Sequence, residues 1–407
     1  MEGVGMRKTI TIKDLGKVIT GKTPPKTNKN YYGDYAIFLK PTDISEDSKY
    51  TYETEERYSK LAADKYKTSL IPKGAICVPC IGTIGTKMTM AHCACYTNQS
   101  INSIVCNDNY DNEYVYYLIK NFLPGLKSYN LGTASGREYV SKSNFELIEI
   151  EVEQDKATQH RIATILSRYD SLIENHQKQI KLLEEAAQRL YKEWFIDLRF
   201  PGHENTKIVD GVPEGWEKKK AIDFFTMSIG KTPPRAEKQW FVDEKEGIPW
   251  VSISDMKGTT FICSTSEGLT KEACDKFKVK IVPAGTILLS FKLTVGRVSL
   301  ANMCVCTNEA IAHFQKDGTN WREYTYLYLK NYHYDSLGNT SGISKAVNST
   351  IIKNMPFLFP SEVVLNKFHR MAKSYIDRVK FLSLQIRHLT EARDRLLPKL
   401  MSGEIEV

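Results

Sequence analysis

An internal repeat constrains this chain more than any other feature of its sequence. The motif GKTPP at residues 21–25 returns at 230–234, an offset of 209 residues. The motif TNQ at 97–99 returns as TNE at 307–309, an offset of 210 residues. Because chance similarity does not preserve both order and spacing, the chain is expected to hold two copies of one structural unit.

Each copy begins with a globular part made mainly of short strands. Runs of β-branched and aromatic residues alternate there with Gly and Pro, as in GTILLS at 285–290. Such runs, bounded by turn residues, are typical of strands joined by loops. Some helix is expected around 114–122 and again around 324–332, where YVYYLIKN and YTYLYLKN correspond.

Each copy ends in a long amphipathic segment. From Ile162 and from Phe368, seam positions recur at alternating steps of four and three, which is the a/d pattern of a coiled coil. His176 and Arg393 are the departures from apolar character, and Pro398 is expected to kink or end the second helix. The apolar seam is assigned to Ile162, Leu166, Tyr169, Ile173, Ile180, Leu183, Leu190, Phe368, Tyr375, Val379, Leu382, Ile386, Leu389 and Leu396.

These features together predict a mixed α/β chain with a pseudo-twofold internal repeat. Two such helices in one chain can satisfy each other, so the economical arrangement is an antiparallel coiled coil with a globular part at each end. The Gly and Pro residues between the copies cannot continue a helix. The expected parts are a first globular domain at 1–157, a helix at 158–199, a linker at 200–215, a second globular domain at 216–360 and a helix at 361–403.

The sequence contains a full match to a phosphate-binding motif, but the residues that follow the match do not allow the structure that this motif needs. Residues 16–23 read GKVITGKT and match G-x-x-x-x-G-K-[ST] in full. That motif requires a helix to begin at its end, yet Pro24 and Pro25 follow at once and disfavour helical backbone. The second copy has Phe225 where the first glycine would recur, so GKTPP is the repeated unit.

No other feature predicts catalysis, a metal or a cofactor. Cys77, Cys80, Cys93 and Cys95 have poor zinc spacing and apolar neighbours typical of a buried strand. Common hydrolase, zinc-protease and dinucleotide motifs are missing from the sequence, which favours a non-enzymatic binding protein. The net charge of +8 permits a polyanionic partner. With no signal-peptide pattern and no long apolar run, we expect a cytoplasmic protein with reduced cysteines.

Further motifs extend over nearly the whole chain. With the two GKTP segments they are IPWV at 248–251 leading to Asp255, VPAGTIL at 282–288, TNQS at 97–100, QHRIA at 159–163, GVPEGW at 211–216 and LLPKLMSGEI at 396–405. In their order and duplication the chain resembles the specificity subunits of type I restriction-modification enzymes. Two features depart from that pattern: Glu309 stands where the first copy has Gln99, and His160 occupies a position where Lys or Gln would be unsurprising.

The resemblance implies a DNA-recognition subunit that has no catalytic chemistry of its own. Each globular domain would be a target-recognition domain that reads one half of a bipartite DNA site. The helices would act as a spacer and dock two methyltransferase subunits, to which restriction nuclease-translocase subunits can be added. The halves of the target should differ in sequence and be separated by a fixed number of unspecified bases, since half-site spacing follows the separation of the domains that read them.

Candidate DNA-contacting residues lie in the repeated polar loops. Lys and Arg suit phosphates and guanine, Asn and Gln suit adenine, and Ser and Thr hydroxyls suit the backbone. Asn98 and Asn308 are the most apt to be structural, because Thr-Asn persists in both copies. The candidates are Lys22, Lys26, Lys40, Thr42, Lys87, Asn98, Ser135, Arg137 and Lys142 in the first copy, and Lys231, Arg235, Ser252, Ser254, Lys292, Arg297, Asn308, Ser344 and Lys345 in the second.

Three other interpretations stay open at this point. The chain could serve a related restriction system whose partner is one fused methylase-nuclease. It could be a nucleotide hydrolase that uses residues 16–23. It could also be a coiled-coil scaffold with protein-binding ends, in which case it would show no salt-dependent affinity for DNA.

Overall fold

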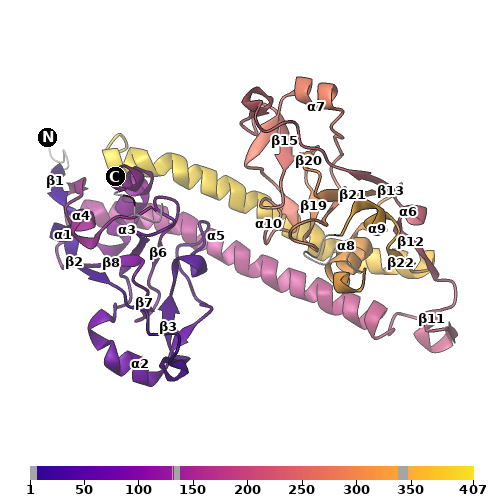
Figure 1. Ribbon diagram of the computed structural model, residues 1–407, viewed down its shortest axis with the longest axis horizontal. Coiled ribbons are helices and arrows are strands. Elements are labelled where there is room, and N and C mark those ends of the chain that lie inside the picture. The colour runs from indigo at the N-terminus through magenta and orange to yellow at the C-terminus, as the bar shows by residue number, and fades with distance from the viewer. Residues whose placement is uncertain (1–6, 131, 133–137, 338–346) are drawn as a thin grey trace. The chain divides into compact units, whose positions relative to one another are not determined.

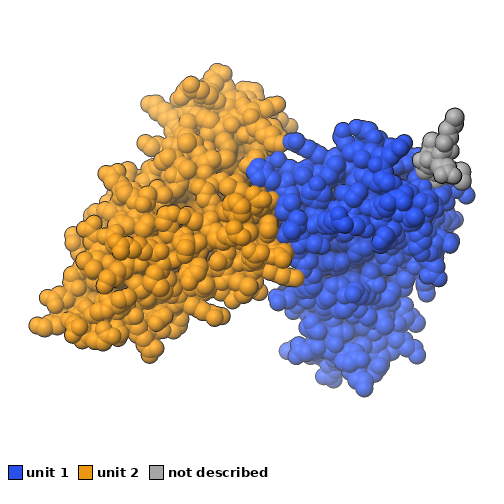
Figure 2. All heavy atoms as spheres, turned by 180° about the vertical axis from the view of Figure 1, so that it is seen from behind, with its two compact units in different colours: residues 1–174, 388–407 blue, residues 175–387 orange. Residues whose placement is uncertain are grey.

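The computed structural model describes residues 7–130, 132, 138–337 and 347–407. The chain divides into two compact units, coloured separately in Figure 2. Unit 1 comprises residues 1–174 and 388–407, and unit 2 comprises 175–387. Each long helix contributes residues to both units.

Unit 1 is built on strands from three sheets. A four-stranded antiparallel sheet has the order β2-β8-β5-β6, a three-stranded sheet has the order β4-β3-β7, and β1 pairs with β9. The strands and short helices of unit 1 are β1 (Arg7–Thr11), α1 (Ile12–Leu15), β2 (Gly16–Thr20), β3 (Tyr32–Leu39), β4 (Arg57–Tyr58), α2 (Lys60–Lys65), β5 (Ile76–Pro79), β6 (Thr89–Met90), β7 (Tyr96–Thr97), β8 (Ile101–Cys106), α3 (Asn112–Phe122), α4 (Lys142–Glu146) and β9 (Glu149–Glu153).

Unit 2 repeats this plan with one more strand in each of its two larger sheets. Its five-stranded sheet has the order β13-β21-β18-β19-β16, its four-stranded sheet has the order β14-β17-β15-β20, and β12 pairs with β22 as β1 does with β9. The elements are β10 (Ile208–Val209), β11 (Val212–Pro213), β12 (Glu217–Lys220), α6 (Ala221–Phe224), β13 (Thr226–Ile229), β14 (Phe241–Val242), β15 (Ile248–Val251), β16 (Phe261–Ile262), β17 (Glu267–Leu269), α7 (Lys271–Phe277), β18 (Ile287–Ser290), β19 (Val298–Ala301), β20 (Cys306–Thr307), β21 (Ile311–Gln315), α8 (Arg322–Lys330), α9 (Ser349–Lys353) and β22 (Pro356–Phe359).

The parallel strand pairs show how closely the two units correspond. In unit 1, β3 and β7 run parallel, with Leu39 opposite Thr97. In unit 2, β15 and β20 run parallel, with Val251 opposite Thr307. The sequence repeat therefore corresponds to a repeat of fold, as the order and spacing of the motifs predict.

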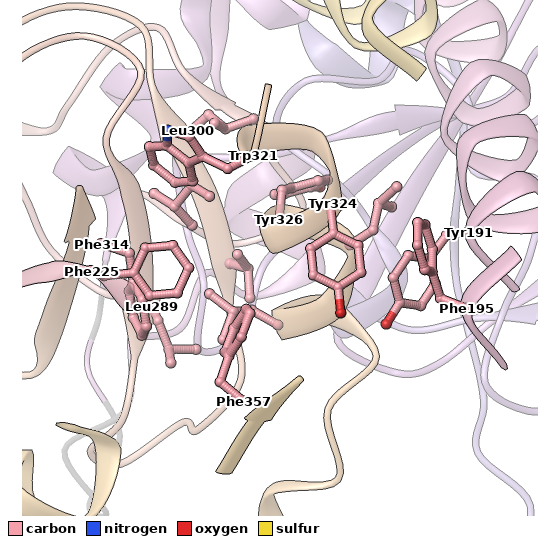
Figure 3. Close-up of a cluster of buried hydrophobic side chains, with 14 of the residues drawn as sticks. Tyr191, Phe195, Phe225, Leu289, Leu300, Phe314, Trp321, Tyr324, Tyr326 and Phe357 are labelled. Atoms are coloured by element: carbon pink, nitrogen blue, oxygen red, sulfur yellow. The ribbon is translucent and has the colours of Figure 1, made fainter. Parts of the chain in front are cut away.

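The core of unit 2 is rich in aromatic side chains. Strand β18 is buried on both faces, which explains its unbroken apolar run. Tyr324 on α8 lies edge-on to Phe195, with ring centroids 4.6 Å apart, and both belong to the cluster drawn in Figure 3. Phe225 packs edge-on against Phe314 in the same cluster, with ring centroids 5.6 Å apart. Such edge-to-face pairs add specificity to the apolar burial that holds the sheet against α8.

Two long helices, α5 (Lys156–Tyr191) and α10 (Glu362–Ser402), match the expected periodic segments (Figure 1). A five-residue π-helix over Lys192–Ile196 follows α5. In unit 1 the two helices run antiparallel, because Arg161 bonds to Val407 whereas Asp170 pairs with Arg393. In unit 2, Trp194 packs on Phe368 with ring centroids 5.6 Å apart. Every apolar seam residue named above is buried or half-buried.

Helix α10 continues past Pro398, so of the two outcomes expected at this residue, a kink or an end of the helix, the structure excludes the end. Pro398 lies inside the helix, which continues to Ser402. Pro398 lacks the N–H that would bond to the Asp394 carbonyl, and separately the carbonyls of the last turn lack intrahelical donors, as at any helix end. The Arg7 guanidinium donates to Leu400 at 3.3 Å and also to Met401. Gly403, at φ +76°, then closes the helix as a C-terminal glycine commonly does.

Candidate nucleic-acid interface

The two repeated motifs of each copy are hydrogen-bonded to each other. In unit 1 the backbone amide of Lys22 donates to the Thr97 carbonyl at 2.9 Å. In unit 2 the amide of Lys231 donates to the Thr307 carbonyl at 2.8 Å. The motifs therefore persist together because each supplies the other's backbone partner.

The glycine of each GKTPP motif is required by this close approach. A Cβ atom on Gly21 would lie 2.1 Å from the Thr97 carbonyl oxygen, and one on Gly230 would lie 2.0 Å from the Thr307 hydroxyl. The threonine of each motif fixes the next position, since Thr23 donates to the Gln99 amide oxygen and Thr232 to a Glu309 carboxylate oxygen.

The local backbone also excludes the phosphate-binding alternative. Residues 16–20 form strand β2, and the Gly-Lys-Thr segment that follows does not begin a helix. A phosphate loop instead aims the amides at a helix N-terminus toward its ligand. Since Lys22 uses its amide on Thr97, the segment has the wrong geometry for nucleotide binding.

Two further loops join the repeated motifs at the ends of neighbouring strands. The amide of Asn98 donates to Leu39 at 3.0 Å, and that of Asn308 to Val251 at 3.0 Å, which brings in the loops after β3 and β15. The backbone amide of Cys80 donates to the Ser100 carbonyl at 2.7 Å, which brings in the loop after β5. In unit 2 the amide of Phe291 donates to the Ala310 carbonyl at 2.9 Å, which brings in the loop after β18. We call residues 21–26, 40–43, 80–87 and 97–100 loop cluster 1, and residues 230–235, 252–255, 291–297 and 307–310 loop cluster 2.

In loop cluster 1, Lys22, Lys26 and Thr42 are exposed. The positive charge of Lys40, in contrast, is balanced by two carboxylates. The Lys40 side chain is 17% exposed and pairs with Glu55 at 2.6 Å and Glu56 at 3.1 Å. Burial alone would lower the pKa of Lys40, but the hydrogen bonds to Glu55 and Glu56 outweigh it and raise that pKa. An ammonium held by two carboxylates is poorly placed to hold a phosphate.

The other candidates of unit 1 are less well placed for contact with a ligand. Asn98 and Lys87 are half-buried, and Asn98 accepts the Ser100 amide at 3.0 Å through its side chain, which fixes the turn. Lys142 begins α4 outside the cluster and pairs with Glu146 at 3.4 Å. The candidates Ser135 and Arg137 lie outside the described residues.

In loop cluster 2, Lys231, Lys292 and Ser254 are exposed. The Arg235 guanidinium is also exposed but lies over the rings of Phe241 and Trp250, at 4.1 and 4.5 Å from their centroids. It also pairs with Glu267 at 2.7 Å. Stacking and pairing together hold this planar cation in one orientation.

Several candidates in unit 2 stabilise the loops themselves. Ser252 donates to Asp255 at 2.6 Å, and Arg297 donates to the Ile253 carbonyl at 2.6 Å. Asn308 accepts the Ala310 amide at 3.1 Å. The candidates Ser344 and Lys345 lie outside the described residues. The Asn98 and Asn308 geometry is thus the structural role expected of a residue retained in both copies.

Sequence reasoning did not select Gln99 or Glu309, which occupy equivalent exposed positions of the two clusters. Partial burial raises the pKa of Glu309, but the Thr232 hydrogen bond and the nearby Lys292 and Arg235 outweigh it and lower that pKa. Aligning the two copies would have pointed to Gln99 and Glu309, because the third residue of TNQ differs in TNE while the first two are the same.

A buried histidine supports the frame of loop cluster 2. His313 on β21 is fully buried, between Ser228 at 2.8 Å and Thr307 at 2.7 Å. Burial lowers the pKa of His313 to about 4, so its ring is neutral near pH 7. A neutral imidazole can donate at one nitrogen and accept at the other, which satisfies both neighbours.

The cysteines identified in the sequence behave as buried apolar residues. Burial raises the pKa of Cys77 and that of Cys80 to about 12, so both stay protonated thiols. Within the part of the chain that the structure describes, no cluster of three or more His, Cys, Asp or Glu side chains could hold a metal ion. The described helices also include none with the length and apolar character to cross a membrane.

Comparisons with known proteins agree with this duplicated arrangement. The family described as the type I restriction modification DNA specificity domain matches residues 6–185 and 213–363. The MjaIX specificity subunit of a type I restriction enzyme from Methanocaldococcus jannaschii is 29% identical, over 97% of this chain and 93% of its own. The HindI specificity subunit from Haemophilus influenzae is 26% identical, over 62% of this chain and 68% of its own.

A solved structure shares the fold. The S subunit of a type I restriction-modification system from M. genitalium superposes with a TM-score of 0.58 at 16% identity, over 98% of this chain and 97% of that one. The family match covers both copies of the repeat and most of the sequence. The chain therefore belongs to the type I restriction-modification DNA specificity family.

Proposed function

We propose that this chain is the DNA-recognition subunit of a type I restriction-modification complex and that each loop cluster reads one half of a split target. The observation that carries the proposal is a duplicated frame with different side chains on it. Gly21 and Gly230 sit in the same close contact, while Gln99 is replaced by Glu309.

This division matches the physics of protein–DNA recognition. Contacts to phosphates position a protein, whereas contacts to base edges specify the sequence. Lys22 and Lys231 are equivalent, exposed and tied to the frame through their amides, so we assign them to phosphates. The positions that differ between copies, such as Gln99 and Glu309, suit different bases: Gln pairs with adenine, and Glu accepts from cytosine.

The halves of the target are expected to be unrelated in sequence and separated by a constant gap. Helices α5 and α10 each contribute residues to both units, and we propose that they set this gap. In this proposal residues 1–157 and 216–360 are the target-recognition domains, 158–199 and 361–403 are the spacer helices, and 200–215 is a linker.

The proposal includes the other subunits of the complex. Specificity subunits of type I systems bind DNA and assemble with partner subunits. We propose two methyltransferase subunits, docked on the helices, with restriction nuclease-translocase subunits added to them in the cytoplasm. A fused methylase-nuclease partner remains the alternative, and the genes beside this one distinguish the two.

The test is to co-express the chain with the adjacent methyltransferase and to map modified bases across the host genome. The expected result is one motif with two defined halves and a fixed number of unspecified bases between them. A single continuous motif would contradict the proposal. Absence of DNA affinity at low salt would favour a protein scaffold, because phosphate contacts make DNA binding strongly salt-dependent.

A further inference from the structure

The same tight turn follows the central strand in both units. Three residues after β5 ends, Gly82 has φ +82°, and the amide of Thr83 donates to the Ile81 carbonyl at 3.1 Å. Three residues after β18 ends, Leu293 has φ +60°, and the amide of Thr294 donates to the Lys292 carbonyl at 2.6 Å. Bonds between residues i and i+2 around a positive φ define a γ-turn of the strained kind.

The two copies fill the centre of this turn with opposite residue types. Glycine adopts positive φ without steric cost, and a Cβ on Gly82 would meet nothing within 4 Å. Leucine pays a steric cost for the same backbone. The Leu293 side chain is 96% exposed, so it gains no stabilising apolar contact from the described part of unit 2 that could offset the cost of its positive φ.

The turn that carries Leu293 is held in place by its neighbours. The Ser290 hydroxyl donates to the Thr294 carbonyl at 2.6 Å and accepts the Arg297 amide at 3.0 Å. The Gly296 amide donates to the Ser290 carbonyl at 2.9 Å. These bonds place Leu293 on a braced turn, where an apolar group can be presented to a partner with little further loss of conformational entropy.

The surroundings of Leu293 indicate what that partner is. Lys292 is exposed beside it, and both Lys292 and Arg235 act electrostatically on Glu309, so the turn lies within the basic part of loop cluster 2. A protein partner would be expected to bury several apolar side chains together. Among the described residues of loop cluster 2, Leu293 is the large apolar side chain that is exposed.

We infer that Leu293 contacts a thymine in the half-site read by unit 2, packing on its 5-methyl group in the major groove. That methyl is the apolar feature that a base edge shows there, and the flanking cations suit the adjacent phosphates. The inference rests on the proposed function. It assigns to the second half-site an apolar contact that the glycine turn of unit 1 lacks.

The test compares Leu293→Gly with the native chain, each co-expressed with the adjacent methyltransferase. Leu293→Gly is expected to relax the methylated motif at one T:A position of one half and to leave the other half unchanged. Its melting temperature should be equal or higher, because glycine relieves the strained φ. Ile281→Ala, which trims an exposed apolar residue outside the loop clusters, is the matched control and should leave the motif unchanged.

A second measurement uses the purified complex and a DNA duplex that carries the native motif. Replacing that thymine by deoxyuridine removes the methyl group alone. The native complex should lose about fourfold in affinity, as expected for one buried methyl group, and the Leu293→Gly complex should lose none.

The outcomes separate this inference from the proposed function. The inference is overturned if Leu293→Gly methylates an unchanged motif, or if deoxyuridine weakens DNA binding equally in both complexes. In either case a split motif methylated with the native chain would still support the proposed function. A uniform loss of methylation at an unaltered motif also overturns the inference, because it would place Leu293 away from the bases. If the native complex recognises no DNA motif, both fail together.

Discussion

The buried ion pair between Arg393 and Asp170 offers a quantitative test of how the two long helices are held in unit 1. Their side chains are 5% and 8% exposed, and Nη1 of Arg393 lies 2.6 Å from Oδ1 of Asp170. The Tyr117 hydroxyl on α3 donates to the other carboxylate oxygen at 2.5 Å. One aspartate thus joins α5 to both α10 and α3.

Replacing Arg393 by methionine is expected to destabilise unit 1 by about 3 kcal/mol. Breaking a buried pair typically costs about 3–5 kcal/mol because it leaves an uncompensated charge. The lower end applies here because the Tyr117 hydroxyl still donates to Asp170. The double variant Asp170→Asn with Arg393→Met should lie within about 1 kcal/mol of the native chain, since removing both charges also removes the desolvation penalty.

Hydrogen exchange of the amides in α3 measures this effect locally. A loss of about 3 kcal/mol should speed exchange there by about 100-fold. The five tryptophans (Trp194, Trp216, Trp240, Trp250 and Trp321) all lie in unit 2, so their emission monitors the integrity of that unit separately.

Arg395→Met is the matched control, because Arg395 is exposed on the same helix. Its exchange rates in α3 should stay within about threefold of native, as is usual for surface substitutions. The reasoning is refuted if Arg393→Met leaves α3 exchange at the control level, or if the double variant is no more stable than Arg393→Met alone.

Three further predictions follow from the loop clusters. Gly230→Ala should destabilise unit 2 by more than about 2 kcal/mol in urea unfolding, because the new Cβ meets Thr307 and Asn308 within 2.1 Å, whereas Gly258→Ala, with open space around it, should cost about 1 kcal/mol. Unit 2 should lose up to about 3 kcal/mol of stability as pH falls from 6.5 toward 4, because His313, with its pKa lowered to about 4, is protonated more readily when unfolded; His313→Gln should flatten that slope in pH-dependent melts. Lys231→Ala should weaken DNA binding equally for all sequences and reduce the salt slope by about 1, and a changed motif instead would place Lys231 on a base.

The sequence by itself determined the repeat, the long helices and the rejection of nucleotide binding. These inferences depend on local rules: the two prolines after Gly-Lys-Thr disfavour a helix there, and steps of four and three between apolar residues place them on one helix face. Such rules act over a few residues, so a linear sequence displays them directly. Pro398 is the exception, because the local rule left open whether the helix kinks or ends there, and α10 continues to Ser402. Its last carbonyls are bound by Arg7, nearly 400 residues away in the sequence.

Tertiary structure decided which polar residues remain available to a ligand. Lys40 and Lys22 look alike in the sequence. In the folded chain, however, Lys40 forms ion pairs with Glu55 and Glu56, which come from a segment 15 and 16 residues further along. In the sequence Arg393 interrupts an apolar seam without an evident partner, and the fold supplies that partner by placing Asp170, 223 residues away, beside it. Leu293 gives no sequence signal, because its positive φ and full exposure arise from how the turn closes. Charge partners and side-chain exposure depend on how separate segments pack together, and only the folded chain creates those contacts.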